Sequence, residues 1–206
     1  MASPSQTLEL PLRRRTPDRW AGIALADPLA LLNDHAHLEK KAATNALELL
    51  HRWPEPNPPE NWVRAMTAIA RDEVEHLGLV TRLLARRGGR LTKQHRNPYA
   101  AALRDLVRWG RGAEELVDRL LTSALIELRS CERFEILGRT CPDAELAAIY
   151  RDLWESERTH YLIFLDLARR VPLAETVDAR WSEMLEAEAK IIEAQESGAR
   201  LHGWVS

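Results

Sequence analysis

The chain has 206 residues, of which 45% are hydrophobic and 29% are charged, and its formal net charge is −2. This length is enough for one domain with a substantial core, which we expect to cover residues 1–206. The nearly balanced charge excludes a polycation that binds nucleic acid over its whole surface, so any such contact must come from local basic patches.

Cysteines and apolar runs exclude further classes of protein. Only Cys131 and Cys141 are present, too few for a disulfide framework and wrongly spaced for a Cys-x-x-Cys zinc site. No apolar run approaches the length of a membrane span, and the N-terminus lacks the apolar segment of a signal peptide. We therefore expect a cytoplasmic protein without membrane contact.

The first two long helices are bounded by proline and glycine. Asp27-Pro28 predicts an N-cap followed by proline at the first helical position, and this helix runs to about Trp53, before the sequence PEPNPP. The second helix begins near Pro59 and ends at about Arg87, before Gly88-Gly89.

A crossover and two further long helices follow. Asn97-Pro98 predicts a shorter helix that ends at Gly110, and Cys141-Pro142-Asp143 separates the next two helices. Two helical hairpins joined by a long crossover are typical of ferritin-like bundles. The predicted fold class is therefore all-α, a ferritin-like four-helix bundle with a crossover helix and an additional C-terminal helix. The long helices are expected at about 27–53, 59–87, 112–140 and 142–170, and a last helix near 177–197.

Two Glu-x-x-His pairs occur in the second and fourth long helices, Glu73 with His76 and Glu157 with His160. Residues three apart lie on one helix face, so each pair can offer a carboxylate and an imidazole to the same metal. Such pairs alone are weak evidence, because 21 glutamates and seven histidines would produce roughly 0.7 of them by random placement. A third pair, at positions 48 and 51, lies near a helix end and is interpreted as solvated.

Helical phase strengthens the metal interpretation. At about 100° per residue, both pairs share a stripe with apolar residues. Glu39 and Glu127 interrupt apolar stripes on the first and third long helices in the same way. A di-iron bundle uses this set, one glutamate from each of two helices and Glu-x-x-His from each of the other two. The candidate metal-binding and catalytic residues are Glu39, Glu73, His76, Glu127, Glu157 and His160.

Several alternatives stay open at this stage. Four buried glutamates paired with arginines would explain the same pattern without a metal. Glu132 lies on an adjoining stripe and could replace Glu127 as the ligand from the third long helix. Asp72 could orient a metal-bound histidine, as such ligands usually require, or lie on the surface. Of the two histidines beside Glu39, one could lie near the cavity, and His37 is expected at the surface.

The chain resembles the tRNA 2-methylthio-N6-isopentenyladenosine hydroxylase family in four stretches: HAHLEKKAATNALEL, ARDEVEHLGLV, LIELRSCERFEIL and ESERTHYLIFLDLA. The resemblance covers about residues 20–200. It is more specific than the general ferritin-like pattern, because LEKKAA and RSCERF are associated with this family and are not needed for metal binding.

The resemblance implies a non-haem di-iron monooxygenase with O2 as co-substrate. Its substrate would be the modified adenosine beside the anticodon of certain tRNAs, and the reaction would hydroxylate a terminal methyl of the isopentenyl group. Two iron ions would be held by the same six residues, none of which departs from the family's pattern. Two electrons would come from an external donor, a reductase or ferredoxin.

A tRNA substrate requires contacts to phosphates. Residues 13–15 form one arginine patch. Ordinary solvated charge is the alternative for every basic residue considered. Four tryptophans could stack on splayed bases or close the ends of the bundle: Trp20, Trp53, Trp62 and Trp109. A second patch lies at the crossover and contains the tentative RNA-binding residues Arg86, Arg87, Arg90, Lys93 and Arg96, together with His95. Arg104, Arg108 and Arg111 follow further along the chain.

Two other functions fit a ferritin-like bundle. One is a di-metal oxidase or peroxidase, such as a manganese catalase, that acts on a small molecule. The other is iron storage, which usually requires a multimeric shell. The Pro- and Arg-rich ends and the long crossover at residues 88–111 favour an enzyme with additions for binding a larger substrate.

Overall fold

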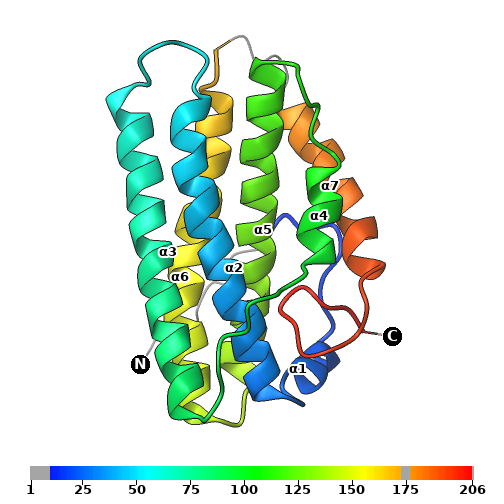
Figure 1. The fold of residues 1–206 in the computed structure, drawn as a ribbon. Helices are drawn as coiled ribbons and strands as arrows, with labels where there is room; N and C mark the ends of the chain where they lie inside the picture. The colour runs from blue at the N-terminus through cyan, green and yellow to red at the C-terminus, as the bar shows by residue number, and fades with distance from the viewer. Residues whose placement is uncertain (1–9, 173–176, 206) are drawn as a thin grey trace, which may run out of the picture.

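The computed structural model describes residues 10–172 and 177–205, and all regular elements within them are helices. Figure 1 shows four long helices that lie side by side along one axis. Their bounds are Pro28–Leu49 for α2, Glu60–Arg86 for α3, Ala113–Thr140 for α5 and Ala144–Arg169 for α6. Shorter elements are α1 (Arg19–Ala24), the 3-10 helix η1 (Leu50–Arg52), α4 (Pro98–Arg104) and α7 (Val177–Glu193).

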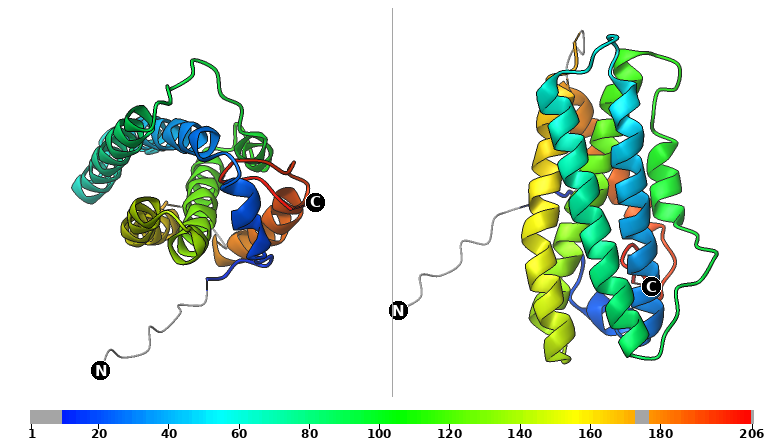
Figure 2. Two further views of the ribbon diagram at one scale, coloured as in Figure 1. Left: turned by 90° about the horizontal axis from the view of Figure 1, so that it is seen from below. Right: turned by 60° about the vertical axis from the view of Figure 1, so that its left-hand side comes forward.

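The long helices form two hairpins. The most extensive contacts join α5 to α6 and α2 to α3, and each pair is connected by a short loop. The segment between α3 and α4 runs along the outside of the bundle, which returns the chain to the end where α5 begins (Figure 2). Among the described helices, none is long and apolar enough to cross a membrane.

Local sequence sets most helix ends. The Asp27 side chain accepts a hydrogen bond from the Ala30 backbone N–H at 3.0 Å, and asparagine and aspartate cap α4 and α6 in the same way. At the end of α3, Gly88 has φ 82°, and the Gly89 N–H donates to the Leu84 carbonyl. This left-handed conformation favours glycine, because a Cβ atom would be strained there.

The crossover helix is shorter than the sequence predicts. It was expected to reach Gly110, but α4 ends at Arg104. The buried carboxylate of Asp118 on α5 accepts from the backbone N–H of Arg108 at 2.9 Å and also binds its guanidinium. This bond takes the N–H that a continued helix would direct to the Arg104 carbonyl, so the chain turns toward α5.

The third long helix, α5, is the central element of the molecule. Figure 2 shows α2, α6, α7 and α4 arranged around it. Most of its residues are buried, including Arg129 and Arg133. The guanidinium of Arg133 lies 4.1 Å from the ring centre of Trp20 and 5.7 Å from that of Trp204, which connects α1 and the C-terminal tail to this helix. α5 therefore contacts the long helix α6 and also packs against α1, α7 and the C-terminal tail.

Candidate metal centre

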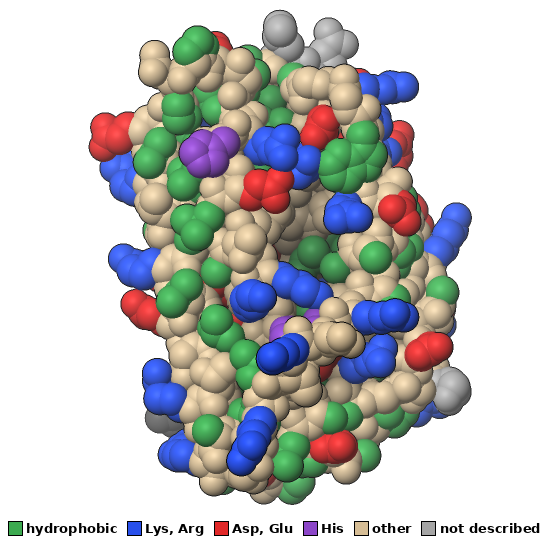
Figure 3. All heavy atoms as spheres, in the orientation of Figure 1, with side chains coloured by type: hydrophobic (Ala, Val, Ile, Leu, Met, Phe, Trp, Pro, Cys, Tyr) green, Lys and Arg blue, Asp and Glu red, His purple; other side chains and the backbone are tan. Residues whose placement is uncertain are grey.

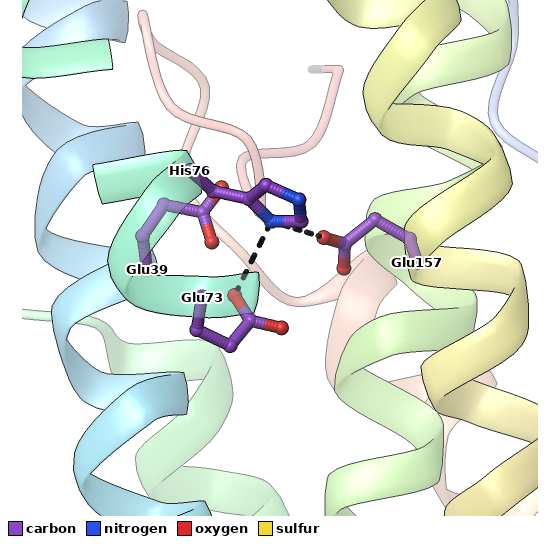
Figure 4. A group of neighbouring side chains, drawn as sticks. All are labelled: Glu39, Glu73, His76 and Glu157. Atoms are coloured by element: carbon purple, nitrogen blue, oxygen red, sulfur yellow. Dashed lines mark ion pairs between the residues drawn. The ribbon is translucent and has the colours of Figure 1, made fainter. Parts of the chain in front are cut away.

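Carboxylates and imidazoles from the four long helices meet in the interior of the bundle. Figure 4 shows one group, in which Glu39 from α2, Glu73 and His76 from α3, and Glu157 from α6 point toward one another. In this group, one ligand atom of each residue lies within 4.8 Å of every other. Nδ1 of His76 is 3.6 Å from Glu73 Oε2 and 3.6 Å from Glu157 Oε1.

A second group of four ligands adjoins the first and consists of Glu73, Glu127, Glu157 and His160. Its ligand atoms also lie within 4.8 Å of one another. Nδ1 of His160 is 2.7 Å from Glu73 Oε1. The two groups share Glu73 and Glu157, the carboxylates of the two Glu-x-x-His pairs. Each group therefore offers a cation three carboxylates and one imidazole.

The residues fit a metal because their buried polar atoms face one another and make no hydrogen bond that satisfies them. Both carboxylate oxygens of Glu73, one oxygen of Glu157 and the Nδ1 atoms of both histidines are buried without a hydrogen bond. The four glutamate side chains are 0–5% exposed. Leaving such atoms unpaired costs free energy, and native structures contain few of them without a ligand, a water or a function. Cations with preference for oxygen and nitrogen ligands would satisfy all of them.

The pKa values of three carboxyl groups lie above their usual range. Burial raises the pKa of Glu127 to about 7, and the nearby charge of Glu73 contributes. Burial, followed by neighbouring carboxylates, also raises the pKa values of Glu39 and Glu157 well above normal. Without cations, these groups retain protons at a pH where an exposed glutamate is ionised. Metal binding would release those protons, since a ligand must be deprotonated.

Glu73 behaves differently because two imidazoles face it. Burial acts to raise its pKa, but the neighbouring His160 and His76 outweigh burial and lower it below the ordinary value. Conversely, burial acts to lower the pKa of His160, while Glu73 raises it to about 9. In the absence of metal, this carboxylate and imidazole form an ion pair at the centre of the cluster.

Residues next to the cluster orient two of its members. Nε2 of His160 lies 3.5 Å from Asp72 Oδ2, so Asp72 faces the imidazole rather than only the solvent. Asp72 is itself held by Arg71. On α2, His35 is buried and its Nε2 hydrogen bonds to Glu39, the residue one turn further on. Such outer partners fix the orientation of ligands, as metal sites usually require.

The structure places the two candidate glutamates of α5 in different surroundings. Glu127 lies in the cluster, whereas Glu132 faces the opposite side of α5. Glu132 accepts hydrogen bonds from the backbone and hydroxyl of Thr16 and pairs with Arg129. The expectation that His37 lies at the surface was wrong. It is buried and stacks on His95 of the crossover, with ring centres 4.7 Å apart, because the crossover segment covers this side of α2.

The basic residues predicted from sequence at the crossover do not form one free patch. Arg86 and Arg87 bind Glu145, and Arg87 also binds Asp143, across the end of the second hairpin. Arg90 and Lys93 are exposed. Arg96 lines a separate cavity of about 420 Å³ between the crossover and the C-terminal tail. Within the arginine patch of residues 13–15, each side chain pairs with a glutamate.

Sequence reasoning missed a cleft that reaches the cluster. It has a volume of about 590 Å³ and lies between α2, α4 and α5. Glu127 belongs to both the cleft wall and the cluster. The cleft depends on how α4 is placed against the bundle, which no local pattern indicates.

The chain matches a known protein family over nearly its whole length. Residues 5–203 match the family described as tRNA-(MS[2]IO[6]A)-hydroxylase (MiaE). A protein of Pseudomonas putida named tRNA 2-(methylsulfanyl)-N(6)-isopentenyladenosine(37) hydroxylase is 39% identical over 191 residues, which are 92% of this chain and 90% of that protein. A Salmonella typhimurium protein of the same name is 28% identical over 237 residues, 92% of this chain and 86% of that one.

A solved structure has the same fold. It is described as protein 43 with aldehyde deformylating oxygenase activity from Synechococcus, and it superimposes with a TM-score of 0.85 at 31% identity. The match covers 96% of this chain and 97% of that one. The prediction of an all-α, ferritin-like four-helix bundle is confirmed.

Proposed function

This chain belongs to the tRNA-(MS[2]IO[6]A)-hydroxylase family, and from that membership we propose that it is an O2-dependent di-iron monooxygenase acting on tRNA. The substrate is 2-methylthio-N6-isopentenyladenosine next to the anticodon, and the reaction hydroxylates its isopentenyl group. The observation that carries the proposal is the pair of ligand groups that share Glu73 and Glu157.

We propose that the six residues hold two iron ions. Glu73 and Glu157 lie in both ligand groups and would contribute to holding both ions. Glu39 and His76 would hold one ion with them, and Glu127 and His160 the other. Carboxylates and imidazoles suit iron, and the absence of cysteine from the set disfavours a soft-metal site. When bound, the iron ions supply the activation of O2 that an unreactive C–H bond requires.

The protein surroundings of the ligands suit an isopentenyl chain. Ala36, Val80, Phe134 and Phe164 are buried, with exposures of 0–1%. Their apolar side chains exclude water from the interior and would contact a hydrocarbon favourably. Hydroxylation places one oxygen atom of O2 in the C–H bond and reduces the other to water. The two electrons that this balance needs come from an external donor, a reductase or ferredoxin.

The proposal is tested by nucleoside analysis. Iron-loaded protein, a reducing system and O2 are incubated with tRNA that carries the isopentenylated nucleoside, and the digested nucleosides are analysed by mass spectrometry. We expect conversion to a product with one added oxygen atom. tRNA that lacks the isopentenyl group is the control and should not change. Unchanged hydroxylated nucleoside in a strain that lacks the protein would contradict the proposal.

A further inference from the structure

The cleft beside the metal cluster is hollowed into one face of the molecule. Figure 3 shows this hollow, with apolar side chains inside it and Lys and Arg side chains around it. Its wall includes the apolar residues Leu38, Ala42, Ala100 and Ile126. Glu127 connects it to the cluster. A volume of about 590 Å³ lies in the range of pockets that enclose a ligand as large as a substituted purine.

Four basic side chains line the opening, and we call them the rim cations: Lys40, Lys41, Arg104 and Arg119. Lys40 and Arg104 are exposed and have no ion-pair partner among residues 10–172 and 177–205. Besides Glu127 in the wall, Glu48 is the acidic residue of the cleft, and it already binds Arg52 at 2.6 Å. The opening is therefore positively charged although the whole chain has a net charge of −2.

Trp109 also lines the cleft, and its side chain is 50% exposed. The guanidinium of Arg119 lies 4.6 Å from the centre of its ring. Arg119 is held in turn by Glu115 at 2.9 Å, so the stack has a fixed support on α5. An exposed tryptophan beside cations is typical of sites that hold unstacked bases of single-stranded RNA.

From this arrangement we infer that the cleft between α2, α4 and α5 is where the anticodon loop binds. The prenylated adenine enters the cleft toward Glu127, a base stacks on Trp109, and Lys40, Lys41 and Arg104 bind loop phosphates. Arg119 stays paired with Glu115 and Glu48 and supports the Trp109 ring. This inference rests on the proposed function and assigns residues to it. Of the residues predicted at the crossover, Arg86 and Arg87 are already bound to Glu145 and Asp143, whereas Arg90, Lys93 and Arg96 are exposed and stay candidates for further phosphate contacts.

Binding of a fluorescently labelled anticodon stem-loop, with and without the isopentenyl group, tests the inference by anisotropy. Trp109→Ala should weaken binding about 5- to 150-fold, which corresponds to the roughly 1–3 kcal/mol of one base–aromatic stack. Trp109→Phe should retain most of the affinity. Arg104→Glu should also weaken binding, and by less at high salt. The control is Arg170→Glu, at the residue that follows α6, which does not line the cleft and should change binding less than twofold.

A second pair of variants tests the cleft itself. Ala100 lines the cleft, whereas the next residue, Ala101, is exposed and does not. Ala100→Phe should remove the preference for the isopentenylated stem-loop over the unmodified one, with circular dichroism and iron content unchanged. Ala101→Phe should keep that preference.

The outcomes separate this inference from the proposed function. If wild-type protein hydroxylates and binds the modified RNA, but the Trp109, Arg104 and Ala100 variants bind like their controls, the inference is wrong and the function stands. If wild-type protein neither binds nor hydroxylates the modified RNA, the proposed function itself fails. Should Ala100→Phe prove unfolded, the comparison of Trp109→Ala with Trp109→Phe decides the assignment.

Discussion

Two clusters of buried charge lie on different sides of α5, and they are satisfied in different ways. In the first, Arg129 is fully buried and donates to both oxygens of Glu188 on α7, at 2.8 and 2.7 Å. Glu132 accepts from Thr16, and the Tyr99 hydroxyl donates to Glu188 at 2.9 Å. Protein groups therefore compensate every charge of this cluster, which attaches the N-terminal segment and α7 to the bundle.

The second cluster is the candidate metal centre, and no arginine enters it. Its four glutamates face two histidines, and five of the ligand atoms have no hydrogen bond. The comparison shows how a structural network differs from a candidate metal centre. Both are buried and acidic, but only the second directs oxygens and nitrogens that lack a hydrogen bond at one another from several helices. Pairing with arginine, the alternative to a metal, accounts for Glu132 and Glu188. It does not account for the four glutamates of the candidate metal centre.

Replacing a carboxylate that both ligand groups share should have the largest effect on iron content and activity. Glu73→Gln removes the charge that lies in both ligand groups. We expect iron content to fall well below two per chain and hydroxylation to fall at least about 100-fold, since even outer partners of metal ligands affect activity 10- to 100-fold. Elemental analysis and the nucleoside assay measure both. Retained iron and activity would show that Glu73 is not a ligand.

Breaking the cluster around Arg129 should instead lower the free energy of unfolding. Arg129→Met leaves Glu188 and Glu132 buried without their cation, which should cost about 3–5 kcal/mol of the free energy of unfolding. Denaturant titration of the metal-free protein measures this loss. Combining Arg129→Met with Glu132→Leu and Glu188→Leu should recover much of it, because no uncompensated charge remains. A loss below 1 kcal/mol in the single variant would contradict this account.

The pH dependence of stability should separate the two clusters in the metal-free protein. The folded-state pKa of Glu127 is raised from 4.5 to about 7, so its contribution is complete below pH 4.5 and is lost as the pH rises through 7. The pKa of His160 is raised from 6.5 to about 9, so its contribution is lost as the pH rises through 9.

Stability of the metal-free protein should therefore fall between about pH 5 and pH 9, by an amount on the order of 3 kcal/mol from Glu127 alone. Thermal melts at several pH values measure the slope. Metal loading should flatten it, because bound carboxylates stay ionised. The Arg129 cluster should not contribute to this pH dependence. The Arg129 guanidinium stays charged between about pH 5 and pH 9, because its pKa is raised above the ordinary value. Equal slopes with and without metal would contradict the assignment.

A smaller effect is expected at the partner of His160. Asp72→Asn weakens the acceptor that faces Nε2 at 3.5 Å. Metal affinity should fall about 10- to 100-fold, as for other outer partners of metal-bound histidines. Competition with a chelator measures the affinity. Glu75→Gln, an exposed change on the same helix, is the control and should leave the affinity unchanged.

The sequence by itself determined the helices and predicted all six residues that meet in the candidate metal centre, with Glu132 as an alternative to Glu127. Caps such as Asp27 and the glycines after α3 act through bonds to residues three to five positions away, so their effect is readable locally. The Glu-x-x-His pairs are local for the same reason, because residues three apart always share a helix face.

Only the tertiary structure decided what depends on packing between distant segments. Glu127 and Glu132 are both buried on α5, and their roles differ because one faces α3 and α6 while the other faces the N-terminal segment. From the sequence, Arg86 and Arg87 are candidates for unpaired surface charge. In the structure, they form ion pairs with Glu145 and Asp143 at the end of the bundle. The cleft exists because α4 packs on α5 and α7 and faces α2 across it, and helical periodicity carries no information on that placement.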